Sequence, residues 1–233
     1  MAFVRGIEYT LLLAVVSVLL AVIPALLLAM MRLSKVKPVK WFAGAYIAVF
    51  RSTPMLVQLS IIYFGLFYAI SLPRISLFGF VDISRFVPGV VALALNSSAY
   101  VAEIFRAGIL AVDKGQTEAA RSLGLSSWQS MRLVVLPQAI KSILPALGNE
   151  FIMIIKDTSL GSTFFIGDLM TQYLVVKGAT YLPIEPLVIV GVIYFIMTFV
   201  LSKVFGHFER KMKKADRNNG YGRKRKQQRE VHI

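Results

Sequence analysis

The stretch that decides the fold is residues 9–31, which reads YTLLLAVVSVLLAVIPALLLAMM. It contains no charged side chain. A bilayer core about 30 Å thick requires roughly 20 mainly apolar residues per helix, so this stretch predicts a membrane-spanning helix. A cleaved signal peptide would have a shorter apolar region and a small-residue cleavage site, and we therefore expect the helix to be retained.

The composition of the rest of the chain agrees with membrane insertion. Hydrophobic residues make up 57% of the chain and charged residues only 16%, whereas about a quarter of the residues in a soluble domain are charged. Cysteine is absent, and the two histidines, His207 and His232, both lie in the basic C-terminal region. The residue types therefore exclude disulfides, a thiolate metal site and a histidine-rich metal site.

Four further apolar runs predict four further spans. In residues 41–70 the only charge is Arg51, and Pro54 predicts a break, because proline disfavours helix in the residue before it and lacks a backbone donor. We expect an approach helix followed by a span over about residues 55–70. The remaining spans are predicted at residues 86–102 (continuing as helix to 110), 134–155 and 186–202, the second of these being interrupted by Pro137, Lys141, Pro145 and Glu150. The predicted fold is an all-α polytopic membrane protein with five transmembrane helices.

The positions of lysine and arginine predict the orientation in the membrane. With five spans, residues 32–40, residues 113–132 and the C-terminal tail share one side, and this side is far more basic than the other. We therefore expect a multi-pass inner-membrane protein with its N-terminus outside and its C-terminus in the cytoplasm. The net charge of +14 gathers in these connections, not on one soluble face, which argues against nucleic acid as a partner.

Residues 113–132 differ from the rest of the chain because they are polar and carry charges of both signs. Residues 115–124 read GQTEAARSLG, and VVLP follows at 134–137. The residues from Glu118 to Arg121 are compatible with helix, and Gly124 can end a helix or let it reverse direction. Ser126 is a suitable cap for a second short helix. The pattern predicts two short helices that project from the membrane as a compact knob.

This segment resembles the coupling loop of ABC importer permeases. The family pattern is Glu-Ala-Ala, three residues, Gly, nine residues and Ile-x-Leu-Pro, and Val134 stands here for the isoleucine. Four other stretches resemble the polar amino-acid branch of that family, which handles His, Arg, Lys, Gln, Glu, cystine and opines. They are RSTPMLVQ at 51–58, AYVAEIFRAGI at 99–109, LPQA at 136–139 and KDTSL at 156–160. The resemblance covers about residues 9–209.

The resemblance implies a type I ABC importer permease fold, with a permease domain over residues 1–210. It also implies the partners: a second permease subunit, identical or homologous, a dimer of separate ATPase subunits, and an extracytoplasmic binding protein that delivers the amino acid. ATP and Mg would be bound by the ATPase. The chain has no Gly-x4-Gly-Lys-Ser/Thr phosphate loop, so we expect no ATP hydrolysis and no cofactor in this chain.

Within that scheme the coupling residues are Gly115, Glu118, Ala119, Ala120 and Gly124. Glu118 is expected to make a polar or ionic contact with the ATPase groove. Ala119 and Ala120 would permit close approach, and Gly124 would form the bend.

Ionisable residues at membrane depth point to the translocation path, because leaving them against lipid costs several kcal/mol. Asn96, Tyr100 and Glu103 are spaced i, i+4 and i+7 and share one face of the third span. This face either lines the path, with Glu103 meeting a substrate ammonium, or packs against another subunit, with Glu103 paired to Arg106. Glu150 in the fourth span is the next candidate for substrate contact.

Three questions stay open at the level of sequence. The substrate is a polar amino acid, with basic amino acids, glutamine and cystine all possible. An ion- or proton-conducting channel is the alternative function, which would explain the intramembrane charges but not the coupling-loop spacing. The basic tail, residues 211–233, is expected to be disordered, and it serves either as a general cytoplasmic anchor or as an attachment to anionic lipids.

Overall fold

The computed structural model describes residues 1–68, 70, 72–73, 75–77, 79 and 81–230, with side chains up to residue 212. The chain is almost entirely helical. Its elements are α1 (Ala2–Leu33), α2 (Lys37–Ser52), α3 (Met55–Ser60), the π-helix η1 (Ile61–Phe67), β1 (Ser76–Leu77), β2 (Val81–Asp82), α4 (Ile83–Leu110), α5 (Lys114–Ser122), α6 (Ser127–Ser130), the π-helical turn η2 (Met131–Val135), α7 (Leu136–Asp157), the 3-10 helix η3 (Thr158–Phe164), α8 (Leu169–Thr180) and α9 (Glu185–Glu230). The two short strands pair antiparallel.

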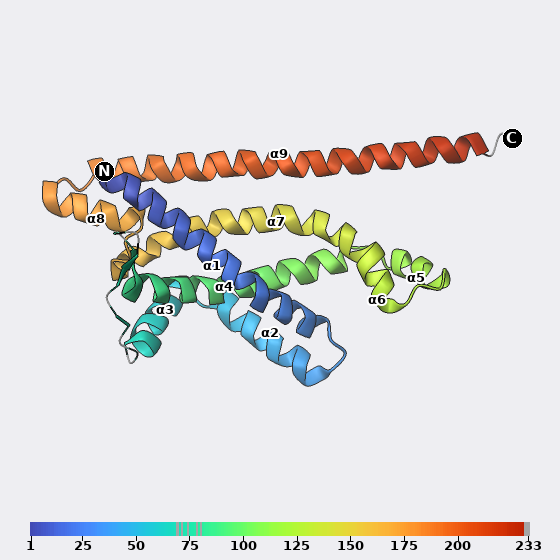
Figure 1. Cartoon of the computed structure of the whole chain (residues 1–233), viewed down its shortest axis with the longest axis horizontal. Helices are drawn as coiled ribbons and strands as arrows, with labels where there is room; N and C mark the ends of the chain where they lie inside the picture. The colour runs from blue at the N-terminus through green and yellow to red at the C-terminus, as the bar shows by residue number, and fades with distance from the viewer. Residues whose placement is uncertain (69, 71, 74, 78, 80, 231–233) are drawn as a thin grey trace.

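The long helices form a bundle with two distinct ends (Figure 1). Within the described residues, four helical segments are long and apolar enough to cross a membrane, and the bent pair of α2 with α3–η1 counts as a fifth if its two limbs form one span. The N-terminus and α8 lie at one end of the bundle, and the turn between α1 and α2 lies toward the other end, where α5 and α6 are found (Figure 1). The five-span, all-α prediction is therefore confirmed.

The bundle is built around α4, which packs against α1, α2, α3 and α7. The contact between α1 and α4 includes small side chains that are at most 1% exposed. On α1 these are Ala25 and Ala29, and on α4 they are Ala99 and Ala102, all in one buried cluster. Small residues let the helix backbones approach closely, which is how helices associate in lipid, where no hydrophobic force drives them together.

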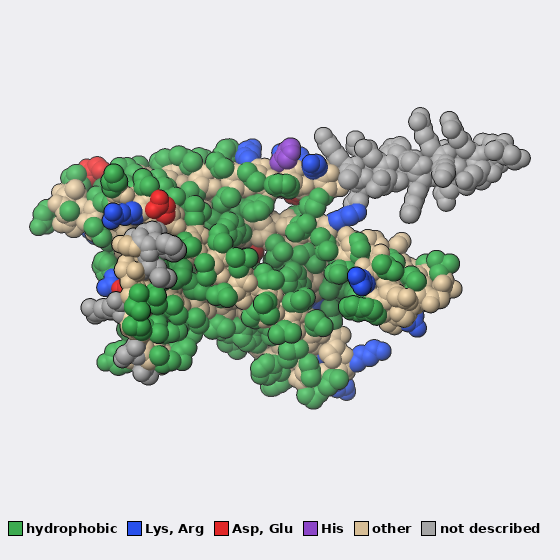
Figure 2. Space-filling model, viewed as in Figure 1, with side chains coloured by type: hydrophobic (Ala, Val, Ile, Leu, Met, Phe, Trp, Pro, Cys, Tyr) green, Lys and Arg blue, Asp and Glu red, His purple; other side chains and the backbone are tan. Residues whose placement is uncertain are grey.

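Large apolar side chains lie on the outside of the bundle. Ile23 on α1 and Phe195 on α9 are 70% and 64% exposed, and hydrophobic side chains cover most of the face seen in Figure 2. A soluble monomer rarely exposes so extensive an apolar surface. The distribution of small residues inside and large apolar residues outside is the one that a lipid-embedded bundle requires.

The second apolar run is broken as expected, but in a different way. Thr53 and Pro54 separate α2 from α3, and the two limbs are bent by 106°. The sequence-based expectation of a complete span over residues 55–70 is wrong, because the described helix ends at Phe67. A helix over residues 55–67 is about 20 Å long at 1.5 Å per residue, too short for the bilayer core. The segment formed by α3 and η1 is therefore not a complete span by itself.

Buried amide side chains satisfy the backbone groups that this break exposes. The Gln58 Nε2 group donates to the carbonyl oxygens of Phe50 and Thr53, at 2.8 and 3.0 Å. The Asn96 Nδ2 group, on α4, donates to Gln58 Oε1 at 2.8 Å. Since unsatisfied backbone groups cost several kcal/mol in a membrane, Gln58 and Asn96 together hold the break in place.

Two other segments differ from the sequence-based expectation. The prolines and charges of the fourth span do not interrupt it: Pro137 lies in the first turn of α7, and Pro145 is accommodated within the helix. The connection between the fourth and fifth spans, for which the sequence predicted no helix, contains η3 and α8. The Gly6 position of α1 lies so close to α8 that an added Cβ would meet Leu169 Cα at 2.8 Å.

The C-terminal helix α9 continues to Glu230. The sequence analysis expects disorder over residues 211–233, and the structure instead continues the helix over residues 211–230. Lysine, arginine and glutamine are good helix formers, and these residue types dominate the segment. Residues 231–233 lie outside the described residues.

A buried carboxylate caps α8. Asp168 is fully buried, and its Oδ2 accepts a hydrogen bond from the Met170 backbone N–H at 2.9 Å while Oδ1 accepts from the Thr171 hydroxyl. The backbone N–H of Leu169 donates to Thr10 Oγ1 at 3.0 Å, which ties the start of α8 to α1. Burial raises the pKa of the Asp168 carboxyl from 3.8 to about 6, because desolvation disfavours the charged form.

Replacing Asn96 with leucine should destabilise the protein. The substitution leaves Gln58 Oε1 buried without its donor, and such a loss costs about 1–3 kcal/mol. We expect the midpoint of thermal unfolding, followed by tryptophan fluorescence in detergent, to fall by several degrees. Asn149→Leu is the matched control, because Asn149 is exposed on α7. Equal midpoints for Asn96→Leu and the control would contradict the role assigned to Asn96.

The raised pKa of Asp168 predicts a pH dependence of stability. Between about pH 4 and about pH 6 the folded protein retains a proton that the unfolded chain has released, so folding stability falls as the pH rises through this window. Asp168→Asn removes the titrating group. The unfolding midpoint of the variant, relative to that of the wild type, should therefore rise from pH 4 to pH 6. A difference that does not change with pH would show that Asp168 does not titrate there.

Candidate functional site

The knob expected between residues 113 and 132 is present. Asp113 caps α5 by accepting a hydrogen bond from the Gly115 backbone N–H at 2.6 Å. Gly124 ends the helix with φ +84°, and the Leu125 N–H donates to the Ala120 carbonyl at 3.2 Å. This is a Schellman motif, whose left-handed residue is usually glycine because a Cβ is disfavoured there. Ser126 and Gln129 form a reciprocal capping box at the start of α6.

The knob presents both polar and apolar side chains to its surroundings. Glu118 and Ala119 are exposed, whereas Ala120 is buried. Only one of the two alanines is therefore available for close approach by a partner. Leu123 and Trp128 are 84% and 70% exposed, and sequence reasoning did not select them. Their position outside the apolar spans, beside a Glu-Ala-Ala motif, is the signal that could have identified them.

Tyr100 and Glu103 line a cavity of about 470 Å³ that is bordered by α1, α2 and α4 and is widely open to the outside of the bundle. Two arginines line it with them, Arg32 from the last turn of α1 and Arg51 from the last turn of α2. The Arg51 guanidinium carbon lies 5.3 Å from the centre of the Tyr100 ring, in a cation–π arrangement. Sequence analysis placed Arg51 before the break but did not select Arg32.

Glu103 is paired to Arg106, as the packing alternative expected. The Arg106 Nε group donates to Glu103 Oε2 at 2.9 Å, and its Nη2 group donates to Oε1. Glu103 nevertheless also lines the cavity, so the two sequence-based alternatives do not exclude each other. The Glu103 carboxylate is therefore paired with Arg106 and also borders the cavity.

The other two candidate path residues lie elsewhere. Asn96 is buried at the break between α2 and α3, where it binds Gln58, and is not among the residues that line the cavity. Glu150 on α7 accepts a hydrogen bond from the Ser97 hydroxyl on α4 at 3.2 Å. Helical spacing predicted one shared face for Asn96, Tyr100 and Glu103. Because α2 ends at the break, Asn96 faces the break, whereas Tyr100 and Glu103 face the cavity.

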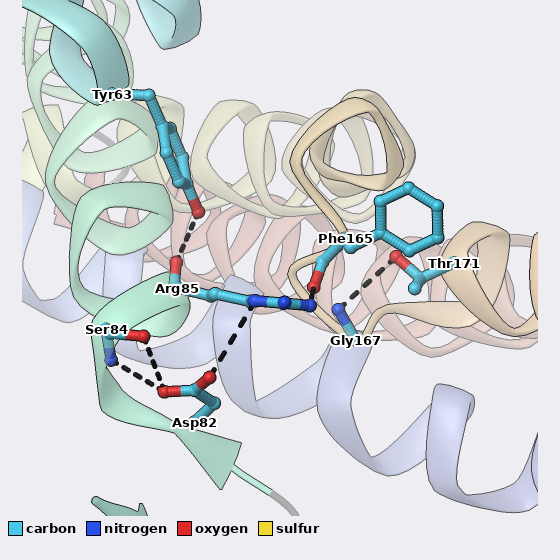
Figure 3. A network of polar contacts seen from close by, with 7 residues as sticks. All are labelled: Tyr63, Asp82, Ser84, Arg85, Phe165, Gly167 and Thr171. Atoms are coloured by element: carbon cyan, nitrogen blue, oxygen red, sulfur yellow. Dashed lines mark hydrogen bonds and ion pairs between the residues drawn. The ribbon is translucent and has the colours of Figure 1, made fainter. Parts of the chain in front are cut away.

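A separate polar network joins three elements at the end of the bundle that holds the N-terminus (Figure 3). Arg85 at the start of α4 donates to the Phe165 carbonyl at 2.9 Å, and its own carbonyl accepts from the Tyr63 hydroxyl. Asp82 lies 3.7 Å from the Arg85 Nε atom. The network connects η1 and α4 to the loop before α8, where Phe165 and Gly167 have positive φ angles.

The part of the chain that the structure describes contains no group of three or more His, Cys, Asp or Glu side chains that could hold a metal ion.

Curated proteins similar to this chain are amino-acid transport permeases by name. The arginine transport system permease protein ArtQ of Bacillus subtilis is 42% identical over 212 residues, which cover 91% of this chain and 93% of that protein. The nopaline transport system permease protein NocM of Agrobacterium fabrum is 42% identical over 84% of this chain and 81% of its own length. A putative glutamine transport system permease protein, GlnP of Rickettsia bellii, is 38% identical over 90% of this chain and 92% of that protein.

Solved structures share the fold. A chain in the crystal structure of an amino acid ABC transporter with histidines matches with a TM-score of 0.82 and 47% identity, covering 90% of this chain and 94% of that one. A chain of the MetNI methionine ABC transporter in an inward-facing conformation matches at 0.72 with 21% identity, which shows the fold alone. Residues 17–214 match the family described as binding-protein-dependent transport system inner membrane component. The chain belongs to this family.

Proposed function

We infer that this chain is the permease subunit of an ABC importer for a polar or charged amino acid. The observation that carries this inference is the family match over residues 17–214, together with relatives that are named as arginine, nopaline and glutamine permeases. The channel alternative rested on intramembrane charges alone. Family membership favours the importer, because this family is a component of binding-protein-dependent transport systems.

Two copies of the permease, or this chain and a homologue, flank the translocation path. A dimer of separate ATPase subunits binds ATP and Mg, and an extracytoplasmic protein delivers the amino acid. The chain itself forms the path and the mechanical connection to the ATPase. It does not hydrolyse ATP. The absence of a phosphate-loop sequence supports this division of labour.

The α5–α6 knob is the contact with the ATPase. Glu118 supplies a charge, and the exposed Leu123 and Trp128 supply apolar area, the combination that protein interfaces use at their anchoring positions. Gly115 and Gly124 shape the knob: Gly115 donates to the cap of α5, and Gly124 adopts the left-handed turn. Ala120 packs inside the knob, and Ala119 lies on its surface.

The knob end of the bundle faces the cytoplasm. Figure 2 shows several lysine and arginine side chains around that end, and the turn between α1 and α2 adds Lys35 and Lys37. The positive-inside rule assigns such an end to the cytoplasm. The N-terminus and the Arg85 network then face the extracytoplasmic side, where the binding protein docks.

Reversing the charge of Glu118 should weaken binding to the ATPase. We expect Glu118→Lys and Trp128→Ala each to reduce the amount of ATPase that co-purifies with the permease, because each removes an anchor from the knob. Glu185→Lys and Trp41→Ala are the matched controls, since both side chains are exposed but lie outside the knob. Co-purification that is unchanged in both knob variants, or equally reduced in the controls, would remove the coupling role from this segment.

Glu103→Gln should strongly reduce amino-acid uptake while leaving assembly with the ATPase intact. The carboxylate faces the cavity, and a charged hydrogen bond of this kind is worth about 1.5–3 kcal/mol, so we expect uptake to fall roughly tenfold or more. Uptake of radiolabelled amino acids into proteoliposomes, with the binding protein present, measures the effect.

Arg106→Gln separates contact with substrate from packing. If Glu103 serves only to pair with Arg106, removing either partner should have the same effect on uptake. If Glu103 contacts substrate, Arg106→Gln should retain more uptake than Glu103→Gln. Wild-type uptake by Glu103→Gln would show that this carboxylate does not take part.

A further inference from the structure

The charges around the cavity between α1, α2 and α4 do not balance. Arg32 and Arg51 contribute two positive charges and Glu103 one negative charge. The Glu103 carboxylate is already paired to Arg106. Among the described residues, neither Arg32 nor Arg51 forms an ion pair with a carboxylate. The cavity is therefore electropositive, and the group that its surplus charge favours is an anion such as a carboxylate.

Arg32 is held in place but lacks an acceptor. Its Nε atom is buried, and no hydrogen-bond partner for it is found among the described residues. The guanidinium lies against the backbone of α2 at Gly44, where an added Cβ would be 3.0 Å from Arg32 Nη1. Because Arg32 lines the cavity, its accessible guanidinium N–H groups, and not the buried Nε, are the donors that an acceptor in the cavity can reach.

Arg51 is oriented independently of Arg32. Its guanidinium is positioned over the Tyr100 ring, and it follows directly before the break that Gln58 and Asn96 hold. Two guanidinium groups from different helices thus border one cavity. The planar donor fork of arginine matches a carboxylate, with which it forms paired hydrogen bonds.

Glu103 provides the complementary charge. A carboxylate has about four lone-pair sites, and Arg106 occupies two of them. The remaining sites can accept hydrogen bonds from an ammonium group. A cavity with two guanidinium groups and one carboxylate has the charges that a zwitterion requires, and about 470 Å³ is ample for one amino acid.

We propose that this cavity binds the backbone of the transported amino acid, with its α-carboxylate held by Arg32 and Arg51 and its α-ammonium held by Glu103. The inference rests on the proposed function and adds the chemistry of recognition to it. The other lining residues include Ile47 and Ala48, which offer no charge to the side chain of the amino acid. The site therefore accepts different amino acids alike, and selectivity resides elsewhere in the importer.

The position of the cavity assigns it to the cytoplasmic half of the path. Arg32 lies in the last turn of α1, near the turn to α2 and on the side of the α5–α6 knob (Figure 1). An amino acid bound there is on its way out of the path. A site that contacts only the α-carboxylate and the α-ammonium of its ligand can bind and release any amino acid that the binding protein has delivered.

Binding of arginine and of agmatine tests the proposal, because agmatine is arginine without its carboxylate. The assembled importer, with its ATPase, is placed in nanodiscs of phosphatidylcholine, and binding of the two radiolabelled compounds is measured. The wild type should bind arginine about tenfold or more tightly than agmatine. It should bind glutamine and arginine with similar affinity. Arg32→Gln and Arg51→Gln should each weaken arginine binding to the level of agmatine, whose own binding should not change.

Lys40→Gln is the matched control, because Lys40 is exposed on α2 and loses the same charge. It should bind both compounds as the wild type does. Size-exclusion chromatography confirms that each variant is assembled. If Arg32→Gln and Arg51→Gln keep the wild-type preference for arginine over agmatine, or if the wild type has no such preference, the proposal is wrong.

A lipid phosphate is the competing occupant. If phosphatidylglycerol in the nanodiscs abolishes arginine binding to the wild type, and the arginine variants retain less of this lipid, the cavity holds a headgroup and the proposal is overturned. Uptake into proteoliposomes, with the binding protein, is measured in parallel. Uptake without the expected arginine preference overturns only this inference, whereas no uptake of any amino acid overturns the proposed function itself.

Discussion

The close contact between α1 and α4 is the interaction on which the rest of the structure depends. Lipid tails are as apolar as the side chains of the helices, so the association of these helices relies on packing and not on the hydrophobic effect. The buried alanines Ala25 and Ala29 on α1, and Ala99 and Ala102 on α4, allow that packing. The helices α2 and α7 each pack against both α1 and α4. Residues of α1, α2 and α4 then line the cavity.

The break between α2 and α3 shows a second constraint, that every backbone polar group in a membrane needs a partner within the protein. Gln58 satisfies two carbonyl groups near the break, and Asn96 in turn satisfies Gln58. This arrangement determines where α2 ends. Because Arg51 is one of the last residues of α2, the same hydrogen bonds place its guanidinium over Tyr100 and beside the cavity.

The cavity and the α5–α6 knob are connected through short segments of chain. Glu103 lies in the last third of α4, and only residues 111–113 separate α4 from α5. On the other side, η2 leads directly from α6 into α7, which packs against α4. In the proposed importer, this continuity is the physical link through which a displacement of the knob would reach the helices that line the cavity.

Much of the fold could be predicted because it follows from local properties of the chain. Apolar length identified the spans, proline identified the break at Pro54, and glycine and serine identified the two helices of the knob. The helix α8 was missed, since its apolar residues and single lysine do not distinguish it from the ends of the flanking spans. The prolines of the fourth span predicted an interruption that the structure does not have. The helix α7 packs against α4 and α9 and accommodates Pro145.

By itself, therefore, the sequence determined which segments are long and apolar enough to cross the membrane and where the α5–α6 knob lies, because both depend on residues that are close together in the chain. Only the tertiary structure decided that Asn96 holds the break, that Ala120 packs inside the knob, and that Arg32, Arg51 and Glu103 surround one cavity. These residues come from separate helices. Their proximity results from the bend of α2 and the packing of α1 on α4, and neither can be obtained from spacing along a single helix.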